Sequence, residues 1–206
     1  MTIPFDGALI VVDVQNDFCA GGALEVPGGG DVVGPINGLL GKFAATVFTQ
    51  DWHPPGHASF ASSHPARSAF DKVELEYGTQ VLWPDHCVIG SEGAQFHSGL
   101  KTDRADLIVR KGFRKSIDSY SAFFENDRTT PTGLEGYLLT RGIGKVCLVG
   151  LALDYCVRYS AVDAKKLGFE TTVVESACRE IAPGESGAEA RAEMLECGVE
   201  LIPAPV

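Results

Sequence analysis

The sequence predicts an α/β fold, with a mostly parallel sheet of six strands and helices on both of its faces. Six apolar runs have strand length and a high content of β-branched residues, and segments of helical character lie between most of them. The runs are almost continuously apolar rather than alternating, which is typical of strands that are covered on both sides. The regular succession of strand and helix then favours a parallel sheet.

The predicted elements follow one another along the whole chain. The strands are expected at ALIVV (8–12), ATVFT (45–49), DLIVR (106–110), KVCLVG (145–150), ETTVVE (170–175) and VELIP (199–203). The helices are expected at 31–43, 132–142, 154–168 and 184–198. Asp31 is a suitable N-cap for the first helix. Gly142, Gly168 and Gly198 stand where the other three helices end, a position that favours a left-handed glycine.

A length of 206 residues is enough for one well-buried core, so we expect a single domain spanning 1–206. One stretch, at about 52–105, interrupts the regular succession of elements. It is rich in Gly, Pro, Ser and His and is too long for a simple connection. Because it also holds tryptophan and several histidines, we expect a loop region that builds a metal and substrate site rather than a disordered segment.

Charge and cysteine spacing exclude some partners. The net charge is −10 and the acids are spread along the chain, whereas nucleic acids and anionic membranes select basic patches. We therefore expect no nucleic-acid and no membrane partner. The N-terminal apolar run, bounded by Asp6 and Asp13, is too short for a signal core or a membrane span. The six cysteines are far apart with no CxxC pair, so we expect reduced thiols and a cytoplasmic location.

Reactive side chains follow four successive predicted strands. Ligands of open parallel sheets bind beyond the carboxyl ends of the strands. The first strand is followed by Asp13, the second by Asp51 and His53, the third by Lys111, and the fourth leads to Cys156. A carboxylate, a metal-binding pair, an amine and a thiol are thus directed to one edge of the sheet, which predicts an active site.

Cys156 is the candidate nucleophile. It lies in VGLALDYCVRYS, which reads as a strand end, a bend and a helix start, where the dipole and free N–H groups favour a negative sulfur. Asp13 is expected to take the thiol proton and later to deliver it to a leaving group, while Lys111 keeps Asp13 ionised. The bend can direct backbone N–H groups at a developing oxyanion, a contribution of about 3 kcal/mol per donor. The other five cysteines are expected to be structural.

A second group of residues has the spacing of a metal site. Asp51 and His53 lie two residues apart in QDWHPPGH and share one face of an extended segment, and WPDHC offers His86 from the loop region. One carboxylate and two imidazoles suit one divalent ion, with zinc favoured over iron or manganese. A hydrolase that uses metal-bound water as its nucleophile is an alternative, although it leaves Cys156 without a role.

Five segments together resemble the nicotinamidases, which are cysteine hydrolases of the isochorismatase-like superfamily. The segments are VVDVQNDFCAGGALEV, TQDWHPPGHASFASSH, LWPDHCVIGSEGAQFH, VRKGFRKSIDSYSAF and GLALDYCVRYSAVDA. The resemblance covers nearly the whole chain and keeps the order of the motifs. It is closer to the nicotinamidases than to the superfamily at large, because most other members lack the D-x-H…H metal set. It implies a three-layer α/β/α fold.

The resemblance also implies roles for the residues at matching positions. These are a catalytic triad of Asp13, Lys111 and Cys156, metal ligands Asp51, His53 and His86, and walls of an aromatic-ring pocket from Phe18, Leu24, Trp83 and Tyr120. It further implies a cis peptide bond between Leu151 and Ala152, with oxyanion donors from the N–H groups of Ala152 and Cys156.

Two positions depart from the pattern of the relatives. Some relatives have a histidine ligand eight residues after the metal aspartate. Here Ser59 occupies that position and His57 stands two residues earlier, so neither is assigned to the metal. Leu153 replaces a threonine that relatives often have, and we expect no change of reaction from it.

The activity that the resemblance implies is hydrolysis of nicotinamide to nicotinate and ammonia through a thioester on Cys156, with the pyridine nitrogen held at the metal. The implied pathway is NAD salvage. Another amide or carbamoyl hydrolase with the same triad is the nearest alternative, and a protein that binds a divalent ion or a pyridine ligand without turnover is the second. The sequence leaves open whether the chain is a monomer or a homo-oligomer, and whether analogues such as pyrazinamide are substrates.

Overall fold

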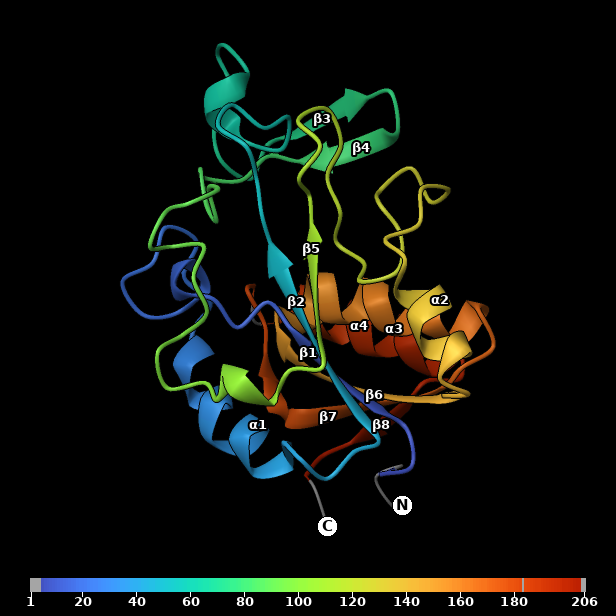
Figure 1. Ribbon diagram of the computed structural model, residues 1–206. Coiled ribbons are helices and arrows are strands. Elements are labelled where there is room, and N and C mark those ends of the chain that lie inside the picture. The colour runs from blue at the N-terminus through green and yellow to red at the C-terminus, as the bar shows by residue number, and fades with distance from the viewer. Residues whose placement is uncertain (1–4, 183, 205–206) are drawn as a thin grey trace.

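The computed structural model describes residues 5–182 and 184–204 (Figure 1). Six of its strands form one sheet in the order β5-β2-β1-β6-β7-β8, and every pairing in this sheet is parallel. The strands are β1 (Ala8–Val12), β2 (Ala45–Asp51), β5 (Leu107–Lys111), β6 (Lys145–Leu151), β7 (Glu170–Arg179) and β8 (Glu200–Ile202). The predicted parallel sheet of six strands is confirmed.

Helices cover both faces of the sheet. Helix α1 (Val33–Leu39) lies on one side, and α2 (Leu134–Thr140), α3 (Arg158–Lys166) and α4 (Glu185–Glu196) lie on the other (Figure 1). From β1 the chain continues to β2, and from β6 it continues to β7, on opposite sides of the central β1–β6 pair. The strand order therefore reverses between β1 and β6, and a ligand crevice is expected beyond the carboxyl ends of these two strands.

The two central strands are buried and lie close together. All five residues of β1 and all but the first residue of β6 are buried, which explains their continuously apolar sequences. Gly150 of β6 has a φ of 115°, and a Cβ atom there would overlap the carbonyl oxygen of Val12. Only glycine combines this backbone conformation with so close an approach. The segments that carry Asp13 and Cys156 consequently leave the sheet side by side.

Several strands extend further toward the site than predicted. Strand β2 reaches Asp51 and β5 reaches Lys111, and these two residues are direct register partners. Strand β7 continues to Arg179, well beyond the predicted end at 175. The prediction followed the apolar runs, so it ended each of these strands close to the end of its run. Here the polar ends stay in the sheet because Asp51 and Lys111 are buried opposite each other.

The ends of α2, α3 and α4 agree with the prediction, whereas α1 starts later and ends earlier than the predicted range 31–43. Gly142, Gly168 and Gly198 follow α2, α3 and α4 with φ values of 69°, 92° and 82°. In each case the next residue donates its N–H back to a carbonyl of the last turn. The prediction that Asp31 caps α1 is wrong. Asp31 lies inside a 3₁₀ turn, Gly29–Val32, that precedes the helix, so the backbone is already helical at this point. Within the part of the chain that the structure describes, no side chain caps α1.

The region 52–105 contains one element that was not predicted. Strands β3 (Lys72–Leu75) and β4 (Gly78–Val81) pair antiparallel, in a hairpin that lies beyond the carboxyl ends of β2 and β5 (Figure 1). Most side chains of the hairpin are exposed or half-buried. Its sequence therefore lacks the continuous apolar run by which the other strands were recognised.

The six cysteines all lie within the described residues, and all are free thiols, which confirms the prediction of reduced cysteines. Cys147 lies in β6 as predicted, whereas Cys197 is the C-cap of α4 rather than a residue of its interior. Over residues 5–182 and 184–204, no helix has both the length and the apolar character needed to cross a membrane.

Candidate active site

Asp13 lies directly after β1 and is completely buried. Its φ of 47° places the backbone in the left-handed region, which Asp tolerates better than most residues. The hydroxyl of Thr49 in β2 donates to Oδ1 at 2.6 Å, and Oδ2 lies 2.8 Å from Nζ of Lys111. Contacts from two other strands thus hold the carboxylate at the end of β1.

Lys111 is the last residue of β5 and is 1% exposed. Its ammonium pairs with the carboxylates of Asp13 and Asp51, donates to the carbonyl of Ser119 at 2.9 Å, and lies 3.4 Å from Sγ of Cys156. Burial acts to lower the pKa of Lys111, but the two carboxylates outweigh burial and raise this pKa above its usual value. Lys111 is therefore a fixed cation between the predicted catalytic and metal-binding carboxylates.

Cys156 follows β6 after a bend. The bend contains a cis peptide bond between Leu151 and Ala152, as the resemblance implies. A single π-helical turn, Leu153–Val157, then leads into α3, and the N–H groups of Tyr155 and Val157 both donate to the carbonyl of Ala152. The bend brings Sγ of Cys156 to within 4.8 Å of a carboxylate oxygen of Asp13.

Burial and charge act in opposite directions on the pKa of the Cys156 thiol. Burial raises the pKa of the Cys156 thiol well above its usual value, and Lys111 opposes this only in part. The thiol must therefore give up its proton to a base before it can attack, which is the role expected of Asp13. Burial also raises the pKa of Asp13 to about 6, against the effect of Lys111. An aspartate with this proton affinity, next to a protonated thiol, is suited to act as a base.

Asp51, His53 and His86 have the geometry of a metal site. Nδ1 of His53 lies 2.9 Å from the carbonyl of Gly112, and Nδ1 of His86 lies 2.8 Å from the carbonyl of Pro84. Carbonyl oxygens only accept hydrogen bonds, so both Nδ1 atoms carry a proton, and each ring in its neutral form presents the lone pair of Nε2.

The two Nε2 atoms face the same carboxylate oxygen. They lie 3.7 Å (His53) and 3.9 Å (His86) from Oδ2 of Asp51. These separations are too long for good hydrogen bonds, but they fit donors that surround one ion, since ligand atoms ~2 Å from a metal lie ~3–4 Å from one another. Burial lowers the pKa of His86 to about 4, which keeps this imidazole in the neutral form that binds metals. The residues present thus fit one divalent ion.

His57 and Ser59 lie beside this group but offer it no free donor. Nε2 of His57 lies 3.1 Å and 3.0 Å from the carbonyls of Arg114 and Ile117, so it carries the proton. Nδ1 accepts a hydrogen bond from the Ser59 hydroxyl at 2.7 Å. The ring of His57 packs on that of His53, with centroids 4.4 Å apart. Both nitrogens of His57 are therefore occupied, and the ring supports a predicted ligand.

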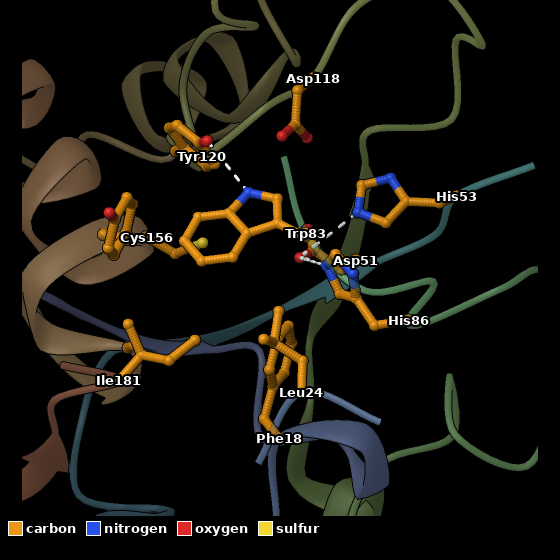
Figure 2. Close-up of a pocket in the computed structure, with 12 residues that line it drawn as sticks. Phe18, Leu24, Asp51, His53, Trp83, His86, Asp118, Tyr120, Cys156 and Ile181 are labelled. Carbon is orange, nitrogen blue, oxygen red and sulfur yellow. Dashed lines mark hydrogen bonds and ion pairs between the residues drawn. The ribbon is translucent and has the colours of Figure 1, made fainter. Parts of the chain in front are cut away.

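Cys156 and the three residues of the metal-ligand group line one pocket (Figure 2). The cavity encloses about 360 Å³ with its open mouth included, which is at the small end for small-molecule sites. All four residues predicted as pocket walls line it: Phe18, Leu24, Trp83 and Tyr120. The indole N–H of Trp83 donates to the Tyr120 hydroxyl at 3.1 Å, with the two rings nearly perpendicular. An aromatic pocket of this size suits a single small ring.

Three further lining residues were not predicted: Asp118, Tyr155 and Ile181. Ile181 follows β7, and Asp154 ties its segment to the bend before Cys156. The buried carboxylate of Asp154 accepts hydrogen bonds from the N–H groups of Ile181 and Ala182, at 2.9 and 3.1 Å, and from the Ser186 hydroxyl at 3.0 Å. No local pattern marks Ile181 or Asp118. The one available signal was Asp154, an acidic residue in an otherwise apolar bend.

Comparison with known proteins identifies the family of the chain. The family described as the isochorismatase domain matches residues 7–204. A nicotinamidase from Acinetobacter baylyi is 51% identical over 195 residues, which covers 95% of this chain and 91% of the relative. The match extends over nearly the full length of both proteins, so it does not depend on a single motif.

Solved structures give the same result. The Acinetobacter baumanii nicotinamidase and pyrazinamidase has a TM-score of 0.94 at 51% identity, with 97% of this chain and 96% of that chain covered. PnC1 from L. infantum in complex with nicotinate has a TM-score of 0.85 at 38% identity, covering 98% and 94%. The pyrazinamidase of Pyrococcus horikoshii in complex with zinc has a TM-score of 0.77 at 35% identity, covering 97% and 99%. The chain belongs to the isochorismatase-domain family and, within it, to the nicotinamidases.

Proposed function

We propose that this protein hydrolyses nicotinamide to nicotinate and ammonia through a thioester on Cys156. One observation carries the proposal. Lys111 contacts both Asp13 and Cys156, and Cys156 lines the same aromatic pocket as Asp51, His53 and His86. A carboxamide on a pyridine ring has a reacting carbon at one end and a ring nitrogen toward the other, so it can engage both groups at once.

The first half of the reaction forms the thioester. Asp13 takes the proton from Sγ of Cys156, and the thiolate attacks the carboxamide carbon. The carbonyl oxygen becomes an oxyanion, to which the N–H groups of Ala152 and Cys156 donate in this proposal. The carbon–nitrogen bond then breaks, and Asp13 gives its proton to the leaving nitrogen, which departs as ammonia. Lys111 keeps Asp13 and the substrate in place throughout.

The second half returns the enzyme to its resting state. Asp13, now ionised, takes a proton from a water molecule, and the resulting hydroxide attacks the thioester carbon. The carbon–sulfur bond breaks, nicotinate leaves, and Cys156 recovers its proton from Asp13.

Asp51, His53 and His86 are the residues that would hold the divalent metal. Zinc is the favoured ion, since two imidazoles and a carboxylate suit it and a zinc-bound relative has the same fold. When bound, the ion supplies a Lewis acid that orients the pyridine nitrogen. The chain's own contribution is to orient both imidazoles through the carbonyls of Gly112 and Pro84.

The proposal extends to the setting of the reaction. We place it in the cytoplasm and in NAD salvage, in line with the free cysteines and the activity above. The continuous sheet, which includes strands from both ends of the chain, supports a single domain over residues 1–206. The net charge of −10 supports small molecules, rather than nucleic acids or membranes, as partners.

The test is steady-state ammonia release from nicotinamide by the wild type and by Cys156→Ala, with Cys197→Ala as the matched control. We expect the control to retain full activity and Cys156→Ala to lose at least about 10⁴-fold in kcat. Near-normal turnover by Cys156→Ala would show that the nucleophile is misassigned. Intact mass spectrometry of the quenched wild type should show a nicotinoyl adduct, which a protein that binds without turnover cannot form.

A panel of amides with and without a chelator separates the nearest alternative. Another amide hydrolase of this family would act on aliphatic amides and would be unaffected by chelation. We expect the reverse, namely a preference for aromatic carboxamides that is lost when the metal is removed.

A further inference from the structure

Asp118 is a buried carboxylate in the pocket wall that the reaction does not use. It is 2% exposed and lines the same cavity as Cys156 and His53. Figure 2 shows its carboxylate pointing into the pocket, between Tyr120 on one side and His53 on the other. A buried carboxylate is costly unless its oxygens accept hydrogen bonds, so its partners must be accounted for.

The partners of Asp118 leave it with spare acceptor capacity. Oδ1 accepts the N–H of Ser119 at 2.8 Å, and Oδ2 lies 3.0 Å from Nε2 of Gln80. The same Nε2 lies 2.7 Å from the carbonyl of Val81 and 2.8 Å from the hydroxyl of Tyr120. An amide nitrogen has two hydrogens, and here three acceptors compete for them. Because Oδ2 is the most distant of the three, it is the acceptor most open to a donor from the pocket.

A 180° rotation of the Gln80 side-chain amide cannot supply the missing donor. Its oxygen, Oε1, already accepts hydrogen bonds from the Tyr77 hydroxyl at 3.1 Å and from Nδ2 of Asn126 at 3.3 Å. A flipped amide would place a nitrogen against the Asn126 amide group and an oxygen against Asp118. The donor shortage at Asp118 is therefore built into the site.

Asp118 lies at the metal-binding end of the pocket. One of its carboxylate oxygens and ring nitrogens of His53 and His57 all lie within 4.8 Å of one another. Phe18 and Leu24 enter the pocket from the opposite side (Figure 2). A ring held here therefore has one polar edge and one apolar edge, and the polar edge lies near the atoms that face the metal.

We propose that Asp118 makes the site selective for pyridine carboxamides that carry an amino group on a ring carbon next to the ring nitrogen. The inference rests on the proposed function, because the ring nitrogen must face Asp51, His53 and His86 for that carbon to approach Asp118. The amino group donates to Oδ2 and satisfies its acceptor capacity. A methyl group of nearly the same size gains nothing there, and an acidic group is repelled.

The experiment compares kcat/KM for ammonia release from the 2-amino, 2-methyl, 6-amino and 6-methyl derivatives of nicotinamide. The zinc-loaded wild type is compared with Asp118→Asn, and Asp103→Asn, at a 78% exposed site, is the control for loss of one carboxylate. The quantity that matters is the ratio of kcat/KM for the amino compound to kcat/KM for its methyl partner. Effects of the substituents on intrinsic reactivity cancel when this ratio is compared between enzymes.

We expect the wild-type ratio at one of the two ring positions to exceed that of Asp118→Asn by about tenfold or more, since a hydrogen bond to a charged group is lost. Asp103→Asn should keep the wild-type ratio. Equal ratios in the wild type and Asp118→Asn at both positions would overturn the inference. The same holds if Asp118→Asn slows every substrate by one common factor, because Asp118 would then only support the structure.

Two further outcomes are separable. If the wild type does not hydrolyse nicotinamide itself, the proposed function fails before Asp118 is tested. If Asp118→Asn does not fold, the wild type alone decides, after correction by the rates of alkaline hydrolysis of the same amides. A corrected ratio below about 2 at both positions then contradicts the inference.

Discussion

The catalytic group and the metal-ligand group share a pocket but are built in different ways. The parallel sheet places Asp13, Lys111 and Cys156. Asp13 follows the central strand β1, Lys111 ends the edge strand β5, and Cys156 follows the central strand β6. His86, in contrast, comes from the irregular region 52–105. Its position depends on a few backbone contacts over long sequence distances, such as the N–H of Cys87 donating to Asp17 at 2.7 Å.

This difference shows which part of the site is robust. The register of the buried sheet places its strand ends, and breaking that register would require much of the core to unfold. The segment that carries His86 is held by individual hydrogen bonds, each of which contributes about 1 kcal/mol to stability. Substitutions in the first group should therefore change chemistry with little change in fold, whereas those around the second should change metal affinity and local stability.

The largest effect is expected from Asp13→Asn. Loss of the base should reduce kcat for nicotinamide by about 10³-fold, within the range for general acid–base catalysis. Because burial disfavours the charged form of Asp13, the neutral isostere should fold as well as the wild type. Ammonia release and thermal unfolding on the same samples check both parts. A large fall in melting temperature would contradict the view that the sheet places this residue independently of its charge.

The next effect is expected from His86→Ala. Loss of one imidazole should weaken zinc binding and lower kcat/KM on the order of 10²-fold. Isothermal titration with zinc and the ammonia assay measure the two effects. His64→Ala is the control, since His64 belongs to the same region but its Nε2 contacts the carbonyl of Ala58. If His86→Ala binds zinc as the wild type does, His86 is not a ligand.

Acidic pH should slow the reaction. Asp13 must be ionised to accept the thiol proton, and its pKa is raised to about 6. Asp13 is ionised when the pH is above its pKa, so kcat/KM should be constant there. Below that pKa, kcat/KM should fall by about tenfold per pH unit. Assays from pH 5 to pH 8 with excess zinc measure the profile. The residual activity of Asp13→Asn should lack this step, and a wild-type profile that stays flat to pH 5 would contradict the role of Asp13.

The smallest effect is expected from Asp17→Ala. Asp17 holds the segment that carries His86. The carboxylate accepts the N–H of Cys87 at 2.7 Å and that of Ala23 at 3.1 Å. Its loss should lower the free energy of unfolding by about 1–2 kcal/mol, and zinc affinity should fall with it. Urea denaturation measures the change. Glu25→Ala, at an exposed site, is the control and should change the free energy of unfolding by less than about 0.5 kcal/mol. Equal losses in the two variants would contradict the view that Asp17 holds the His86 segment.

The same contrast explains how far the sequence could predict the molecule. Continuous apolar runs identified all six strands of the main sheet, and the glycines after α2, α3 and α4 marked the helix ends, because both signals are local. The candidate site residues that follow the strands were also predicted, because they stand directly after these local signals in the sequence. The hairpin β3–β4 was missed because its side chains are largely exposed.

The parts of the site that depend on distant contacts could not be predicted. Asp118 reaches the pocket wall beside Gln80, which is 38 residues away in sequence. The segment of Ile181, which follows β7, is held by the N–H groups of Ile181 and Ala182, which donate to Asp154 before β7. The effect of burial on the pKa of Cys156 is likewise a property of the whole fold, which the local sequence does not show.

The single ammonium of Lys111 has a consequence for engineering this scaffold. It is shared by Asp13 and Asp51, so the metal-binding and proton-transfer functions are not separate modules that can be exchanged one at a time. Removal of the metal by a chelator leaves the charge of Asp51 in place, whereas Asp51→Asn also leaves Lys111 with one carboxylate instead of two. A metal-independent descendant of this enzyme would have to give Lys111 a new anionic partner before it could discard Asp51.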